Sequence, residues 1–146
     1  MYSKQEFINK IYPLVYAIGN SIGVPPLFLM AQIALETGYG KSTLFNTYFN
    51  VGGIKAVTGQ KYVTLPTYEY INNVKTKVNA NFAVYQNLQD GLIHYAKIFQ
   101  NEFFKKYLHQ TTDPFVYVNL LQGGKPQYAT DVNYVKKIQT FINEIK

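Results

Sequence analysis

The chain has 146 residues and a formal net charge of +6, and it contains no cysteine and no arginine. This length suits one domain with one hydrophobic core, and the lack of cysteine excludes disulfides, a thiol nucleophile and zinc–thiolate sites. The positive charge favours an anionic partner. Proteins often recognise bases and phosphates through the forked guanidinium group of arginine, so the absence of arginine disfavours nucleic acid as that partner.

The first third of the chain predicts two helices. Ser3–Glu6 is a capping-box pattern, and apolar residues recur at helical spacing until Gly19–Gly23. Pro25 suits the start of a second helix, which we expect to end near Thr37 before a glycine. Its apolar run, Leu27–Leu35, is too short to span a bilayer. It therefore predicts a buried helix and no stable membrane insertion.

The middle of the chain changes from helical to strand character. Residues 61–86 are rich in Tyr, Val and Thr, and alternating runs flank Asn72–Asn73, which predicts a β-hairpin. Helices are expected again after Asn87 and at Asp113–Pro114, and a last helix is expected to begin at a cap on Thr130 or Asp131. The order predicts an α+β fold, mostly helical, in one domain covering residues 1–146.

The eight acidic residues can be sorted by their positions. Six are expected in helix caps, first helical turns or on the surface: Glu6, Asp90, Asp113, Asp131, Glu102 and Glu144. Glu36 differs because it ends an apolar helix, where the helix dipole and partial burial would both raise its pKa. A carboxyl group that stays protonated near neutral pH can act as a general acid. The structural alternative is an ordinary glutamate paired with Lys41.

The eighth acid, Glu69, lies in the predicted hairpin. Glutamate is not a favoured strand residue, and a cross-strand ion pair with Lys75 or Lys77 would explain it structurally. The two histidines, His94 and His109, show no metal-ligand spacing. No phosphate-binding glycine loop or nucleophile elbow is present either. The two carboxylates are therefore the main candidates for chemistry.

Aromatic residues are abundant, with 14 tyrosines, 10 phenylalanines and no tryptophan. Most must form the core, but tyrosine can also stack on sugar rings and form hydrogen bonds through its hydroxyl. Five tyrosines fall in predicted loops or on the hairpin, where binding residues tend to occur: Tyr39, Tyr48, Tyr68, Tyr70 and Tyr128.

Five blocks of the sequence, in order, resemble the glucosaminidase family of flagellar enzymes and autolysins, glycoside hydrolase family 73. The blocks are Val24–Pro26 with Ala31–Ser42, Asn50–Ala56, Thr67–Tyr70, Asn81–Tyr85, and Tyr128–Asp131 with Tyr134 and Lys137–Ile138. Each block alone is weak, but their order and their spread over nearly the whole chain make the resemblance specific.

The resemblance implies a lysozyme-like fold with a groove between a helical lobe and a hairpin lobe. It implies hydrolysis of the β-1,4 bond after N-acetylglucosamine in peptidoglycan, by a monomer without metal or organic cofactor. Glu36 matches the general acid, Glu69 the second glutamate on a mobile hairpin, and Tyr128 a tyrosine that lines the cleft. Four further residues are expected to contact the substrate: Tyr39, Asn50, Gly53 and Tyr70.

The sequence departs from the family pattern at four positions. The family usually has tryptophan at Tyr39, an aromatic residue at Gly52, glycine at Gln127 and proline at Val132. None of these changes removes a carboxylate, and all concern fine details of substrate binding.

Several alternatives stay open at the level of sequence. Glu69 can activate water at a carboxylate separation of about 6.5–9.5 Å, or act as a nucleophile at about 5–5.5 Å. The N-acetyl group of the substrate can also attack in its place. A muramidase, a non-catalytic wall-binding module and a basic nucleic-acid binder are competing functions. The substrate lies outside the cytoplasm, yet the polar start lacks a signal-peptide pattern, so an autolysin domain, a phage lysin and a virion part all fit.

Overall fold

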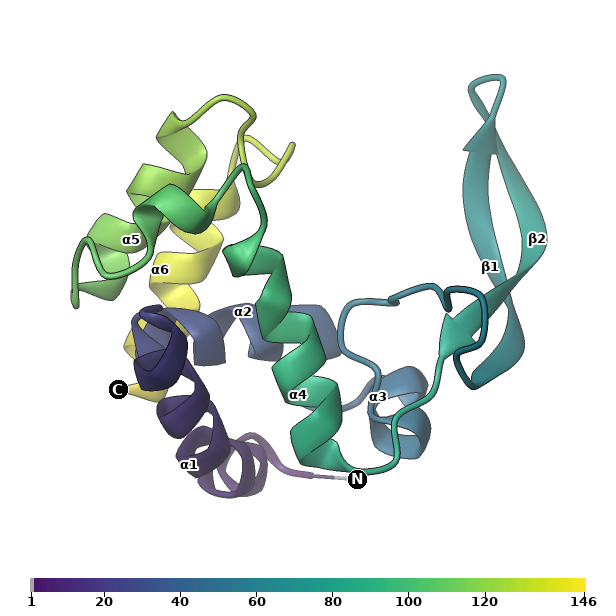
Figure 1. Cartoon of the computed structure of the whole chain (residues 1–146), viewed down its shortest axis with the longest axis horizontal. Helices are drawn as coiled ribbons and strands as arrows, with labels where there is room; N and C mark the ends of the chain where they lie inside the picture. Colours follow the sequence, from purple (N-terminus) through teal and green to yellow (C-terminus); the bar gives the residue numbers. More distant parts are fainter. Residues whose placement is uncertain (1) are drawn as a thin grey trace.

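The computed structural model describes residues 2–146, which form a helical body and a projecting β-hairpin (Figure 1). The elements are α1 (Lys4–Ile22), α2 (Pro26–Thr37), α3 (Thr43–Tyr48), β1 (Tyr62–Ile71), β2 (Val74–Ala83), α4 (Leu88–Ala96), the 3-10 helices η1 (Lys97–Gln100) and η2 (Lys105–Tyr107), α5 (Pro114–Gly123) and α6 (Tyr134–Ile145). The α+β class is confirmed.

Side-chain caps set several of the helix starts. The Ser3 hydroxyl accepts a hydrogen bond from the Glu6 amide at 3.1 Å, and the Asp113 carboxylate accepts one from the Phe115 amide at 2.8 Å. The cap predicted for the last helix is wrong, because α6 begins after Asn133. Asp131 instead accepts from the Asn133 amide and forms an ion pair with Lys137.

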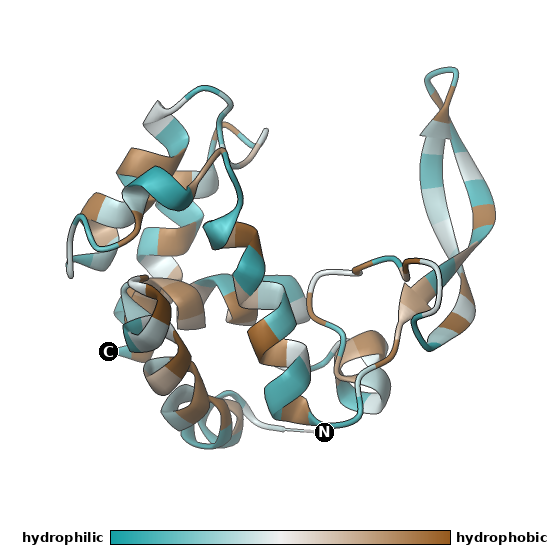
Figure 2. Cartoon of the chain, viewed as in Figure 1, coloured by the Kyte–Doolittle hydropathy of each residue, from teal (hydrophilic) through white to brown (hydrophobic). Residues whose placement is uncertain are grey.

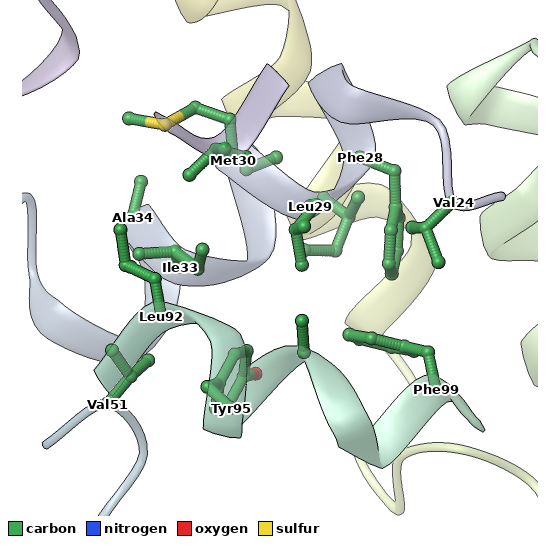
Figure 3. Close-up of a cluster of buried hydrophobic side chains, with 14 of the residues drawn as sticks. Val24, Phe28, Leu29, Met30, Ile33, Ala34, Val51, Leu92, Tyr95 and Phe99 are labelled. Atoms are coloured by element: carbon green, nitrogen blue, oxygen red, sulfur yellow. The ribbon is translucent and has the colours of Figure 1, made fainter. Parts of the chain in front are cut away.

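The core forms around α2, which contacts α1, α5 and α6. Apolar residues occur in bands on the helices (Figure 2), and side chains of α2 and α4 meet face to face (Figure 3). Phe28 of α2 packs edge-on against Phe99 and Tyr117, with ring centroids 5.5 and 4.9 Å apart. Nearly all of α2 is buried, as its continuous apolar run predicts, and this fixes the position of the exposed Glu36 near its end.

The hairpin turns at Asn72 and Asn73, both with positive φ (52° and 65°), as the sequence predicts. Most of its length is exposed or half-buried, and only Phe82 and Ala83 at its base are buried. There the Ala83 amide donates to the Ile54 carbonyl at 2.9 Å. The loop before the hairpin therefore joins it to the helical body.

Candidate active site

Glu36 lies at the end of α2, where Gly38 in the left-handed region (φ 60°) ends the helix. Its side chain sits between two pockets that share Glu36, Ile98 and Tyr128 in their walls. Another pocket, at the N-terminal end of α2 near Pro25 and His109, has no acidic residue in its wall. The surroundings of Glu36 are therefore the better place for acid–base chemistry.

The first of the two pockets, about 410 Å³ in volume, also has Gly52, Ile54 and Tyr95 in its wall. The second, about 450 Å³, is lined in addition by Gln32 and Tyr134, among others. Because the two pockets share three wall residues, they lie next to each other at Glu36, and together we call them the acid groove. Such a hollow gives a polymer room on either side of the group that would protonate it.

Burial raises the pKa of Glu36 above its ordinary value. The side chain as a whole is still exposed, so water limits the size of this effect. No ion pair with Lys41 exists among residues 2–146; instead, Glu36 Oε1 accepts a hydrogen bond from Gln32 Nε2 at 3.2 Å. The surroundings thus favour the protonated form that a general acid needs.

The raised pKa makes a prediction about stability. The pKa of glutamate in an unfolded chain is about 4.3. When folding raises this pKa, the carboxyl group contributes its full stability to the fold at pH values below about 4.3. That contribution is lost as pH rises through the pKa of the folded state. Glu36→Gln, which stays neutral, should therefore be more stable than wild type at about pH 7 and equal to it at about pH 3. Thermal unfolding of both proteins across this range checks it; a stability difference that does not change with pH would contradict it.

Tyr128 is half-buried in the wall of the acid groove. Its ring stacks on Phe99 with centroids 5.4 Å apart, and its hydroxyl lies 3.5 Å from that of Tyr95. Burial raises the pKa of Tyr128 to about 12. The phenol therefore stays protonated at neutral pH and can donate a hydrogen bond beside Glu36.

Gly52 lines the first pocket of the acid groove next to Glu36. It has a positive φ of 77°, and a Cβ atom there would lie 3.4 Å from Glu36 Oε2 and 3.1 Å from the Tyr95 ring. A side chain would press on the Tyr95 ring and touch the carboxyl oxygen. Because Gly52 has no side chain, nothing from this position covers Glu36 Oε2 in the wall of the first pocket.

Glu69 lies apart from this groove, on β1. It forms an ion pair with Lys55 in the loop before the hairpin, and Thr76 stands opposite it in the strand register. The expected pairing with Lys75 or Lys77 is therefore wrong; Lys75 lies over the Tyr68 ring, 5.0 Å from its centroid. The structure does not bring Glu69 into the pockets that Glu36 lines.

Two residues expected to contact substrate are buried. Tyr39 is 5% exposed, stacks on Phe141 and donates a hydrogen bond to Glu144. Glu144 is thus not the purely solvated charge that we predicted. Asn50 is 1% exposed, and its amide bonds to Ile54 and to the Ala83 carbonyl. Neither side chain presents a free face to a sugar, so both assignments are corrected to structural roles.

The other two expected contacts remain accessible. Tyr70 is 75% exposed near the tip of the hairpin. Gly53 has a positive φ of 66°, and a Cβ atom there would meet the Phe82 ring at 3.8 Å. The loop that Asn50 organises therefore carries two consecutive glycines, of which Gly52 rather than Gly53 borders the acid groove.

Comparison with known proteins decides the family. Residues 12–146 match the glucosaminidase family, described as mannosyl-glycoprotein endo-β-N-acetylglucosaminidase. The chain belongs to the glucosaminidase family. This confirms the resemblance found in the sequence and the expected enzyme class, a glycoside hydrolase. Within residues 2–146, no group of three or more metal-binding side chains occurs, and no helix is long and apolar enough to cross a membrane.

Two curated relatives are similar in sequence over nearly the whole of this chain. The chain is 31% identical over 143 residues to the peptidoglycan hydrolase FlgJ of Vibrio parahaemolyticus, covering 93% of this chain and 46% of that protein. It is 27% identical over 149 residues to a probable N-acetylmuramidase of Lactococcus lactis, covering 97% of this chain and 34% of that protein. The chain thus spans half or less of these curated relatives.

Among solved structures, the catalytic domain of the autolysin Auto from Listeria monocytogenes superposes with a TM-score of 0.86 and 30% identity. The match covers 99% of this chain and 88% of that one. It confirms the expected lysozyme-like glycoside hydrolase fold for essentially all of this glucosaminidase domain.

Proposed function

We propose that this glucosaminidase domain hydrolyses the β-1,4 bond after N-acetylglucosamine in peptidoglycan, with Glu36 as the general acid. The observation that carries the proposal is the Glu36 carboxyl group, placed between two open pockets in surroundings that raise its pKa. Family membership and the likeness to a peptidoglycan hydrolase support it. Because the chain matches only part of such relatives, the activity is proposed for this domain alone.

In the proposed mechanism, the glycan strand lies along the acid groove and Glu36 gives its proton to the glycosidic oxygen as the bond breaks. Tyr128 borders the same groove and offers a hydroxyl donor beside the reacting bond. Proton loss leaves Glu36 charged, and Gln32 Nε2, 3.2 Å from Glu36 Oε1, stabilises that charge.

Glu69 is proposed as the second carboxylate, following the family resemblance. Because it is held by Lys55 outside the pockets of Glu36, the hairpin would have to move toward the groove when substrate binds. It can then activate water, attack the sugar or stabilise charge while the N-acetyl group attacks. The choice among these depends on the carboxylate separation in the closed state.

Two variants separate the catalytic role of Glu69 from its ion pair. Lys55→Met and Glu69→Gln break the same pair, whose partners are largely exposed (58% and 38%), so each should cost less than about 1 kcal/mol of unfolding free energy. Only Glu69→Gln removes the carboxylate, and it should lose about 10²-fold or more in kcat. Initial rates on purified peptidoglycan check this; equal losses in both variants would give Glu69 a purely structural role.

A muramidase that cuts the other glycan bond is the second candidate, favoured by the likeness to the probable N-acetylmuramidase. Purified peptidoglycan should be digested, reduced with borohydride and analysed by mass spectrometry. Reduced N-acetylglucosamine ends are expected. Reduced N-acetylmuramic acid ends would establish the muramidase, and binding without any fragments would establish a wall-binding module. We also propose that the domain acts as a monomer on the glycan strand of the cell wall, outside the cytoplasm.

A further inference from the structure

The least expected feature beside Glu36 is a buried amide. Gln32 lies one helical turn before Glu36 on α2 and is 1% exposed. Its Nε2 donates to Glu36 Oε1 at 3.2 Å, and its Oε1 accepts a hydrogen bond from the Tyr134 hydroxyl of α6. A buried glutamine with both ends of its amide occupied has a single orientation. Gln32 therefore presents its amide N–H, and not its carbonyl oxygen, to Glu36.

We infer that Gln32, held by Tyr134, is a positioning residue that places the proton of Glu36 on Oε2, the oxygen that faces the acid groove. This inference rests on the proposed role of Glu36 as general acid, and it adds to that role which atom delivers the proton.

The chemistry of the amide carries the first step. An amide nitrogen has hydrogens to donate and accepts no hydrogen bond. The Glu36 oxygen that faces Gln32 Nε2 must therefore be an acceptor without a proton. When Glu36 is protonated, the proton is left on Oε2. A Cβ atom on Gly52 would lie 3.4 Å from that oxygen, and Gly52 lines the first pocket, so the proton points to the place where a glycosidic oxygen can lie.

Tyr134 carries the second step, because it prevents the amide from turning over. The Tyr134 side chain is 4% exposed, and its hydroxyl donates its hydrogen bond to Gln32 Oε1. A reversed amide would leave the hydroxyl proton buried without an acceptor, which is costly. It would also present a carbonyl oxygen to Glu36 Oε1, which would draw the proton away from the groove. The contact between α2 and α6 thus determines the direction of proton delivery.

The Tyr95 hydroxyl also lies near the Gln32 amide and Glu36, but the other ionisable groups around the acid form no hydrogen bond with the Glu36 carboxyl group within residues 2–146. Besides Tyr134, the acid groove is lined by the following titratable side chains: His94, Tyr95, Lys97, Tyr128, Asp131 and Lys137. Asp131 and Lys137 pair with each other at 2.5 Å. Within residues 2–146, the carboxyl group of Glu36 accepts its hydrogen bond from Gln32. Replacing the amide therefore tests its role while these groups stay in place.

The experiment compares Gln32→Leu, Tyr134→Phe and the control Tyr117→Phe with wild type. Tyr117 is a buried tyrosine outside the groove whose hydroxyl has no hydrogen-bond partner within residues 2–146, so its loss should change nothing. Two readouts are needed: the titration of the Glu36 carboxyl carbon by ¹³C NMR, assigned with Glu36→Gln, and the pH dependence of kcat/KM on peptidoglycan.

The amide N–H favours the charged carboxylate, so its removal should raise the titration midpoint of Glu36. Gln32→Leu should raise the midpoint, move the basic limb of the pH profile upward and lower the maximal rate roughly tenfold. Tyr134→Phe leaves the amide in place but free to turn, and should raise the midpoint in the same direction. It also keeps the inference testable if Gln32→Leu does not fold.

An unchanged Glu36 midpoint in folded Gln32→Leu and Tyr134→Phe would overturn the inference. So would an equal shift in Tyr117→Phe, because the effect would then be a general response of the core. The NMR readout needs only folded protein. If wild type cuts no peptidoglycan while the midpoint still rises in the two variants, the proposed function fails, and only the hydrogen-bond control of the Glu36 carboxyl group by Gln32 stands.

Discussion

Glu36→Gln should lose about 10²- to 10⁴-fold in kcat on peptidoglycan, the usual contribution of a general acid. The amide has nearly the size of the carboxyl group and can still accept the hydrogen bond from Gln32 Nε2, so fold and substrate binding should be preserved. Initial rates of glycan release and a sedimentation assay of binding to insoluble wall measure the two properties separately.

The matched control is Glu102→Gln, which changes an exposed glutamate outside the acid groove. Its activity should equal that of wild type. If Glu36→Gln kept most of its activity, or if both variants lost it equally, Glu36 would not be the acid and the site would have to be sought elsewhere in the chain.

Gly91→Ala should cause a large loss of stability, because an added Cβ atom would make a shorter contact here than at any other glycine. Gly91 lies in the first turns of α4, and a Cβ atom there would lie 2.0 Å from the backbone oxygen of Phe49. A backbone atom cannot turn aside as a side chain can, so α4 would have to shift. We expect a cost of about 3 kcal/mol or more in unfolding free energy, at the upper end for overpacking.

The control for this prediction is Gly123→Ala, at the end of α5, where nothing lies within 4 Å of the added methyl group. Alanine should be neutral there or stabilising by about 0.4–1 kcal/mol. Urea unfolding of the two variants compares them directly. Similar stabilities would mean that α4 does not approach Phe49 as closely as the structure describes.

The fold could be predicted well because its signals are local. The Ser3 cap, the proline-led starts of α2 and α5 and the Asn72–Asn73 turn each follow from a few adjacent residues. The six-residue helix α3 (Thr43–Tyr48) was not predicted, because a helix of that length is too short to show an apolar period.

The candidate site could be predicted only in part, because its contacts join distant residues. The position of Glu36 at a helix end pointed to a raised pKa, and burial does raise it. By contrast, Gln32 meets Tyr134 across 102 positions of sequence, and Tyr39 meets Glu144 across 105. Such pairs leave no periodic or adjacent pattern. A tyrosine in a glycine-rich loop was therefore expected on the surface and is in fact buried.

The central claim is that Glu36 donates a proton to the leaving group. Its most direct test is how the activity loss of Glu36→Gln depends on the leaving group. Wild type and variant should be compared on aryl β-glycosides of N-acetylglucosamine oligomers, with a phenyl and a dinitrophenyl leaving group. A dinitrophenolate leaves without protonation, so the variant should lose about 10²-fold or more on the phenyl glycoside and little on the dinitrophenyl glycoside. Equal losses on both substrates would contradict proton donation by Glu36.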